Sequence, residues 1–113
     1  MKQPFGYARF RAFHNDNPDV FRLLEKYTQE AYALGKEKLG LWLLVGRARW
    51  DSEVVTTGSE YKLPNGAIGY YSRLLMHRHP EWVGLFDVRP MLDPPPWWTN
   101  EDPRNPTTTL EHS

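Results

Sequence analysis

The sequence contains no cysteine, which removes several kinds of chemistry at once. Disulfide bonds, thiolate catalysis and cysteine-ligated zinc are excluded, and a reducing compartment is compatible with the chain. No apolar run approaches the roughly 20 residues that a membrane-spanning helix needs, and the first residues lack the apolar stretch of a secretory signal. We therefore expect a soluble, unprocessed, cytoplasmic protein with no membrane partner.

The chain also lacks an excess of charge of either sign, because 14 basic and 14 acidic residues balance. A strongly basic coat for nucleic acid and a polyacidic imitation of DNA are therefore excluded. The balance conceals a division. Residues 1–90 hold 13 Lys and Arg against 10 Asp and Glu, whereas residues 91–113 hold one against four. The sequence predicts a mildly basic body that carries an acidic tail.

Motifs for catalysis and metal binding are missing as well. The chain has no GxSxG nucleophile elbow, no GxxxxGK phosphate loop, no HExxH and no GxGxxG. His77 and His79 are two residues apart, so on a helix they point roughly opposite ways, whereas zinc needs three or four converging ligands. We predict that the protein is not an enzyme and holds no metal or cofactor.

The chain does have enough length and aromatic content for one hydrophobic core. Its 113 residues suit a single domain, and 14% of them are aromatic. Six of the ten prolines lie from Pro90 onward, in a stretch with few aliphatic side chains. We assign residues 1–90 to one globular helical domain and residues 91–113 to a proline-rich, flexible, acidic tail.

The clearest helical pattern starts at Pro18. Asn17 is expected as its N-cap, and Gly35 supplies a C-terminal stop. Between them lies one apolar stripe, formed by Val20, Phe21, Leu24, Tyr27, Ala31 and Leu34. A second, deeply packed helix is predicted over residues 37–50, where leucine is abundant.

Two short β segments are predicted from alternation and turn residues. Residues 5–13 alternate aromatic and basic positions with small or apolar ones, which is typical of a short strand or an extended arm. Residues 54–63 contain β-branched residues on both sides of Gly58-Ser59, which indicates a hairpin.

A third helix is expected from Asn65, as its N-cap, to His79, because Pro80 cannot continue it. The predicted fold is therefore α+β and mainly helical, with three principal helices and a small β-hairpin. Helix-turn-helix and winged-helix modules are built from the same parts. In the common winged module the hairpin follows the recognition helix. The predicted hairpin follows the second helix here, so this apolar helix would have to read DNA, or else the third helix does.

The third helix is the better candidate for this role, because no acidic residue lies between Asn65 and Glu81. The preferred function is that of a small regulatory protein that binds DNA or RNA through this helix and the hairpin. The predicted contacts are Lys62, Arg73 and Arg78 to phosphates and Tyr70 to a base. The alternative for the same cations is the ordinary solvated surface of a domain.

A tryptophan pair, Trp97-Trp98, follows three prolines in the predicted tail. Large apolar rings are costly to leave in water, so the pair is expected either to fold back on the domain or to be presented to a partner protein. The alternative function is therefore a protein–protein interaction module, an inhibitor or adaptor of a host complex. Its predicted anchors are Trp82, Trp97 and Trp98.

A series of short motifs runs along residues 13–89: Asn17-Pro18, Gly35, Arg49-Trp50, Thr56-Thr57, Tyr61-Lys62-Leu63, Asn65, Tyr70-Tyr71-Ser72-Arg73, His79-Pro80, Phe86 and Arg89. This series resembles a group of small uncharacterised proteins from bacteriophages and prophages. The resemblance implies a viral protein that acts in the host cytoplasm, and it assigns no activity to any residue.

Overall fold

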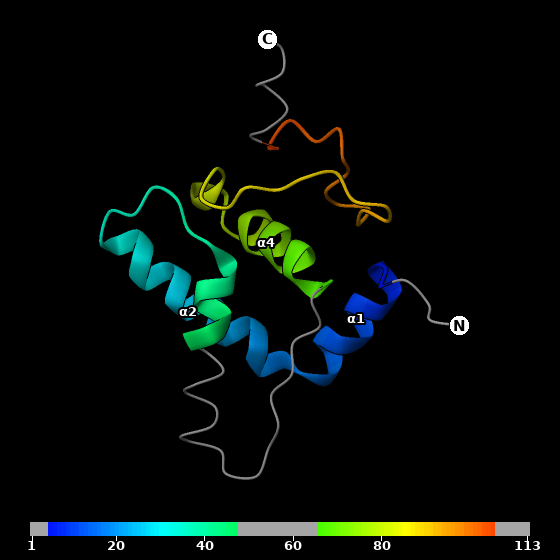
Figure 1. Cartoon of the computed structure of the whole chain (residues 1–113), viewed down its shortest axis with the longest axis horizontal. Helices are drawn as coiled ribbons and strands as arrows, with labels where there is room; N and C mark the ends of the chain where they lie inside the picture. The colour runs from blue at the N-terminus through cyan, green and yellow to red at the C-terminus, as the bar shows by residue number, and fades with distance from the viewer. Residues whose placement is uncertain (1–4, 48–65, 106–113) are drawn as a thin grey trace.

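A computed structural model of the chain describes residues 5–47 and 66–105. The elements in these ranges are α1 (Tyr7–Asp16), α2 (Pro18–Ala33), a helical segment over 41–47, α4 (Ala67–Arg78) and the short 3-10 helix η1 (Pro80–Trp82). Figure 1 shows α4 at the centre, with α1 and α2 meeting at an angle on one side of it and the C-terminal segment passing over the other side.

The described ranges are helical or irregular, and no β-strand occurs in them. The predicted α+β class, with its helix-turn-helix or winged-helix-like order, is therefore wrong, and this part of the chain has a helical fold. The hairpin expected over residues 54–63 lies outside the described residues. Residues 5–13 were predicted as a strand or arm, but most of them belong to α1. Tyr7, Phe10 and His14 are spaced so that they share one helix face.

The first predicted helix is confirmed as α2, and it begins at Pro18. Proline suits this position because the first N–H groups of a helix have no partner within it. Asn17 does not act as the predicted side-chain cap of α2. Its Nδ2 instead donates to the backbone oxygen of Phe13 at 3.0 Å. The prediction was wrong in this detail because Asn17 closes α1 as well as preceding α2.

The predicted stop at Gly35 is also confirmed, and the structure shows how it works. Gly35 has a φ of 89°, a left-handed conformation that costs glycine little. Its N–H donates to the oxygen of Tyr32 at 3.0 Å, and the N–H of Lys36 donates to the oxygen of Ala31 at 3.2 Å. This pair of bonds is a Schellman motif, which satisfies the last carbonyls of α2.

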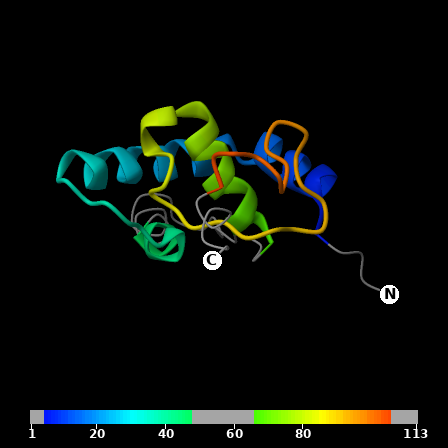
Figure 2. The same ribbon diagram turned by 90° about the horizontal axis from the view of Figure 1, so that it is seen from above.

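The second predicted helix is shorter at its start than expected. Residues 41–47 are helical, whereas the prediction began at residue 37, and residues 48–50 lie outside the described ranges. The connection from α2 is fixed by the N–H of Leu39, which donates to the oxygen of Leu85 at 2.8 Å. Leu41, Leu44 and Val45 point into the core. Figure 2 shows this segment below α2 and joined to it by a loop at one end.

The third predicted helix is confirmed as α4, which ends at Arg78 just before Pro80. The prediction of its N-cap was wrong, because Gly66 and not Asn65 holds that position. It is the most buried element in the described part of the chain. Its buried residues are Ala67, Tyr70, Tyr71, Ser72, Arg73, Leu74, Leu75 and Met76. Phe10 of α1 packs between two of its rings, with centroids 5.0 Å from Tyr70 and 4.8 Å from Tyr71. A helix covered on most sides is the centre of a core rather than a surface for a ligand.

Residues 91–105 pack on the body formed by the preceding elements. Met91 and Asn100 pair through two hydrogen bonds of 2.9 Å, from the Met91 N–H to Asn100 Oδ1 and from Asn100 Nδ2 to the Met91 oxygen. Trp98 is fully buried and belongs to the same core as α4. This part of the predicted tail therefore contributes to the core, and residues 106–113 lie outside the described ranges.

Candidate interaction groove

The predicted nucleic-acid contacts on α4 do not form a common surface. Tyr70 is buried, and its hydroxyl donates to the backbone oxygen of Asp93. Burial and then the Asp93 carboxylate raise the pKa of Tyr70. Arg73 is buried too, its guanidinium donates to the backbone oxygens of Gly69 and Arg89, and burial lowers the pKa of Arg73. Neither side chain is placed to reach a phosphate or a base.

Arg78 differs from the other two predicted contacts on α4 because it is exposed. Its guanidinium carbon lies 5.3 Å from the ring centroid of Phe21 on α2, which is a cation–π distance. Lys62 lies outside the described residues. Among the predicted contacts on α4, Arg78 alone reaches solvent.

The three predicted tryptophan anchors occupy different environments. Trp82 is buried and stacks on His79, with ring centroids 3.9 Å apart. Trp98 is also buried, and its Nε1 donates to Asn105 Oδ1. Trp97 is half-buried, and its Nε1 donates to the hydroxyl of Tyr7 at 3.0 Å. The tryptophan pair was expected either to fold back on the domain or to be presented to a partner. In the structure both rings pack on the domain.

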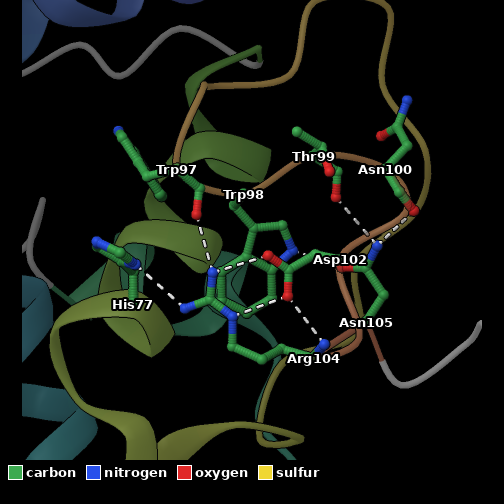
Figure 3. Close-up of polar contacts among 8 residues, drawn as sticks. All are labelled: His77, Trp97, Trp98, Thr99, Asn100, Asp102, Arg104 and Asn105. Carbon is green, nitrogen blue, oxygen red and sulfur yellow. Dashed lines mark hydrogen bonds and ion pairs between the residues drawn. The ribbon is translucent and has the colours of Figure 1, made fainter.

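One arginine holds this C-terminal segment together (Figure 3). The guanidinium carbon of Arg104 lies 4.0 Å from the ring centroid of Trp98. Its Nη2 donates to the backbone oxygen of Trp97 at 2.8 Å, and its Nε and Nη2 each donate to an Asp102 oxygen at 2.8 Å. Such a forked pair fixes direction as well as charge. The cluster explains why an acidic, proline-rich segment is held in place.

His77 completes the cluster from the end of α4. Arg104 Nη1 lies 3.1 Å from His77 Nδ1, and because arginine has only donors, this contact requires a neutral histidine that accepts. Burial, then the Arg104 charge, lower the pKa of His77. The hydrogen bond from Arg104 lowers the pKa of Asp102. The cluster is therefore a structural clamp whose groups are already paired, and it has no free group for catalysis.

A different part of the molecule presents an open surface. The second half of α2 and the helical segment 41–47 enclose an apolar groove with a volume of about 580 Å³. We call it the α2 groove. Its lining residues are Tyr27, Glu30, Ala31, Leu34, Lys36, Leu39, Trp42, Leu43, Leu44, Gly46 and Arg47.

Large apolar side chains stand exposed around the α2 groove. Leu34 is 81% exposed, Leu43 75% and Trp42 54%. The exposure has a local cause. Leu34 follows the last residue of α2, where the Schellman turn directs it away from the body, while Trp42 and Leu43 lie on the side of their helix opposite the buried Leu41, Leu44 and Val45.

Charged groups lie beside this apolar surface. Arg47 Nη2 is 3.2 Å from Glu30 Oε1, and the guanidinium carbon of Arg47 lies 4.3 Å from the ring centroid of Tyr27. Lys26 Nζ approaches the same ring at 5.7 Å. Lys36 is exposed, and it makes no ion pair with any of the residues in 5–47 and 66–105. The groove thus has an apolar floor and more positive than negative charges nearby.

Sequence reasoning missed this surface because the leucine-rich stretch of residues 39–46 was read as entirely core. The signal was present in its composition. A helix that is apolar on all sides needs cover on all sides, and a chain of this size has few elements to provide it. Trp42 and Leu43 are therefore the functional candidates that the pattern did not separate from their buried neighbours.

Other kinds of site have no support in the described ranges. No three His, Asp or Glu side chains there converge as metal ligands would, and none of the helices there is long and apolar enough to cross a membrane. No protein-family model, curated protein or solved structure matches this chain.

Proposed function

We propose that this chain is a protein–protein interaction module that binds its partner in the α2 groove. The observation that carries the proposal is the group of exposed apolar side chains around a concave apolar surface. Exposed apolar patches of this kind mark interaction sites in soluble proteins, and anchors such as tryptophan dominate their binding energy. The resemblance to phage proteins supports the context of this proposal, a host protein in the host cytoplasm as the partner, and the inhibitor or adaptor role is part of the proposal itself.

The proposal takes up the alternative predicted function, a protein–protein interaction module, in place of the preferred nucleic-acid function, and it changes the residues that serve it. Trp98 and Trp82 are buried and support the core, so the anchors move to Trp42, Leu43 and Leu34. The nucleic-acid function stays a prediction. It loses support because Tyr70 and Arg73 are buried and hydrogen-bonded within the fold.

The test is affinity capture from a bacterial extract with the full chain and two variants, with the captured proteins quantified by mass spectrometry. Leu43→Glu places a charge on the rim of the groove, where desolvating it opposes binding. Leu92→Glu makes the same change at a fully exposed leucine far from the groove in sequence and is the matched control.

We expect the wild-type chain and Leu92→Glu to capture the same partner, and Leu43→Glu to lose it by at least about tenfold, as a hot-spot residue does. Circular dichroism should show equal helix content in all three proteins. Equal capture by Leu43→Glu and Leu92→Glu would remove the α2 groove from the proposal.

A further inference from the structure

The geometry points to one kind of occupant for the α2 groove: an acidic amphipathic helix of the partner protein. This inference rests on the proposed function and adds the chemistry of the partner segment to it. It follows from the polarity of the groove floor, from the helices that form its walls, and from the charges beside it.

The polarity of the groove decides between a helix and an extended peptide. The floor is made by apolar side chains such as Ala31, Leu39 and Leu44, the charged side chains that line it belong to exposed residues, and Tyr27, which also lines it, is buried. An extended peptide brings unpaired N–H and C=O groups, and burying them without partners is costly. No strand in the described ranges offers a sheet edge to pair with them. A helix satisfies its own backbone and needs only an apolar face.

The walls suit a third helix. Residues 27–33 span about 10 Å along α2, so the groove accepts roughly two turns of a docking helix. Its walls are themselves helical, as Figure 1 shows for α2 and the segment after its connecting loop. Apolar side chains spaced i, i+3, i+4 and i+7 on the partner would then contact Leu34, Trp42 and Leu43, in the way that amphipathic helices fill apolar grooves.

The charges beside the groove indicate the sign of the charge on the partner helix. Two cations, Lys36 and Arg47, line the groove against one carboxylate, Glu30, which is already paired with Arg47 at 3.2 Å. Lys26 does not line the groove, but its Nζ lies 5.7 Å from the ring centroid of Tyr27, which does. Lys36 has no ionic partner among the described residues and is the cation best placed to meet a carboxylate. Complementary charge speeds association and selects partners more than it adds affinity. The flanks of the docking helix are therefore acidic.

The experiment uses the full chain and fluorescein-labelled peptides of about 18 residues, long enough to form helix alone. The acidic probe is built from Leu, Ala and Glu with leucines at i, i+3, i+4 and i+7. Three relatives serve as controls: a twin with Lys in place of Glu, a scrambled sequence of the same composition, and a twin with two central prolines that prevent a helix. Binding is measured by fluorescence anisotropy.

We expect the acidic helix to bind in the micromolar range and more tightly than the basic, scrambled and proline-containing peptides. Leu43→Ala should weaken binding of the acidic probe by at least about tenfold. Lys36→Glu should weaken it by about two- to fivefold and strengthen binding of the basic twin, because one exposed ion pair is exchanged for a repulsion. Leu92→Ala should change neither value.

Several results would overturn the inference. If the proline-containing peptide bound as tightly as the acidic probe, no helix would be needed. If the basic twin bound more tightly than the acidic probe, the partner helix would be basic and not acidic. A dimer abolished by Leu43→Glu in sedimentation velocity would make a second copy the occupant. Failure of the acidic probe while affinity capture still depends on Leu43 would reject the acidic helix and leave the proposed function standing. Loss of that dependence would reject the proposed function itself.

Discussion

At the scale of single residues, two of the tryptophans in the described ranges, Trp98 and Trp42, lie in opposite environments. Trp98 is fully buried and lies under the guanidinium of Arg104, whereas Trp42 is more than half exposed beside the α2 groove. Both follow apolar or proline-rich stretches in the sequence, so local composition does not distinguish a core ring from a docking ring. Their environments give opposite expectations for stability and for binding.

We predict that Trp98→Ala lowers the free energy of unfolding by about 3–5 kcal/mol, because it leaves a large cavity in the core. The matched change Trp42→Ala should lower it by less than about 1 kcal/mol, as most surface substitutions do. Urea denaturation of the two variants measures both values. Equal losses would show that the C-terminal segment does not belong to the core.

At the scale of elements, helix α1 depends on a residue near the other end of the chain. The N–H of Tyr7, in the first turn of α1, donates to Asp93 Oδ2 at 2.9 Å, across 86 positions of sequence. The residue that precedes the helix, Gly6, makes no side-chain cap. A carboxylate at a helix N-terminus satisfies a free donor and suits the helix dipole. Asp93 thus joins the C-terminal segment to the first helix.

Replacing Asp93 tests this link. Asp93→Ala should lower the free energy of unfolding by about 0.5–2 kcal/mol, as loss of a cap does, and should speed amide hydrogen exchange in the first turn of α1. Asp87→Ala removes an exposed carboxylate paired with Lys38 at 3.0 Å and is the control, with an expected cost below about 1 kcal/mol. Unchanged exchange in α1 with Asp93→Ala would contradict the capping role.

Elements with local signals could be predicted from the sequence, and those with distant partners could not. The stop of α2 at Gly35 and the end of α4 before Pro80 depend on backbone chemistry within a few residues, so both were predicted. Helix α1 was missed because its cap comes from Asp93. The burial of Arg73 was missed because backbone oxygens, which carry no sequence signal, bind its guanidinium.

The candidate site was only partly predictable for the same reason. The pair Trp97-Trp98 predicted a protein–protein interaction module as the alternative to nucleic-acid binding, but no pattern in the sequence predicted the α2 groove. Leu41 and Leu43 are both leucines in one run, and only the packing of their helix decides that the first is buried and the second exposed. A pattern read without its neighbours assigns both to the core.

At the scale of the whole molecule, two histidines make stability depend on pH. Burial and then the Arg78 charge lower the pKa of His14, and burial and then the Arg104 charge lower that of His77, from an ordinary value of 6.5. The folded protein thus favours the neutral histidines. This contribution is fully present above pH 6.5, and it is lost as the pH falls below 6.5 toward the lowered values, because the unfolded chain binds protons first.

We therefore predict that the free energy of unfolding falls between about pH 7 and about pH 5. Urea melts at both values measure the fall, and the double variant His14→Gln, His77→Gln should show a smaller one. The pKa of Asp102 is also lowered in the folded protein, from an ordinary value of 3.8. The free energy of unfolding should therefore fall further below pH 3.8, because protonation of Asp102 ends its ion pair with Arg104. A fall of the same size in the double variant between about pH 7 and about pH 5 would contradict the assignment to these histidines.

Site-specific photo-crosslinking shows most directly whether a partner docks in the α2 groove. A photoreactive amino acid replaces Leu43 in one protein and Leu92 in another, two exposed leucines of which only the first lines the groove. Each is irradiated in a bacterial extract, and the covalent products are compared. We predict a discrete partner adduct from position 43 and none from position 92. The same adducts from both positions, or an adduct from position 92 alone, would show that the α2 groove is not the docking site.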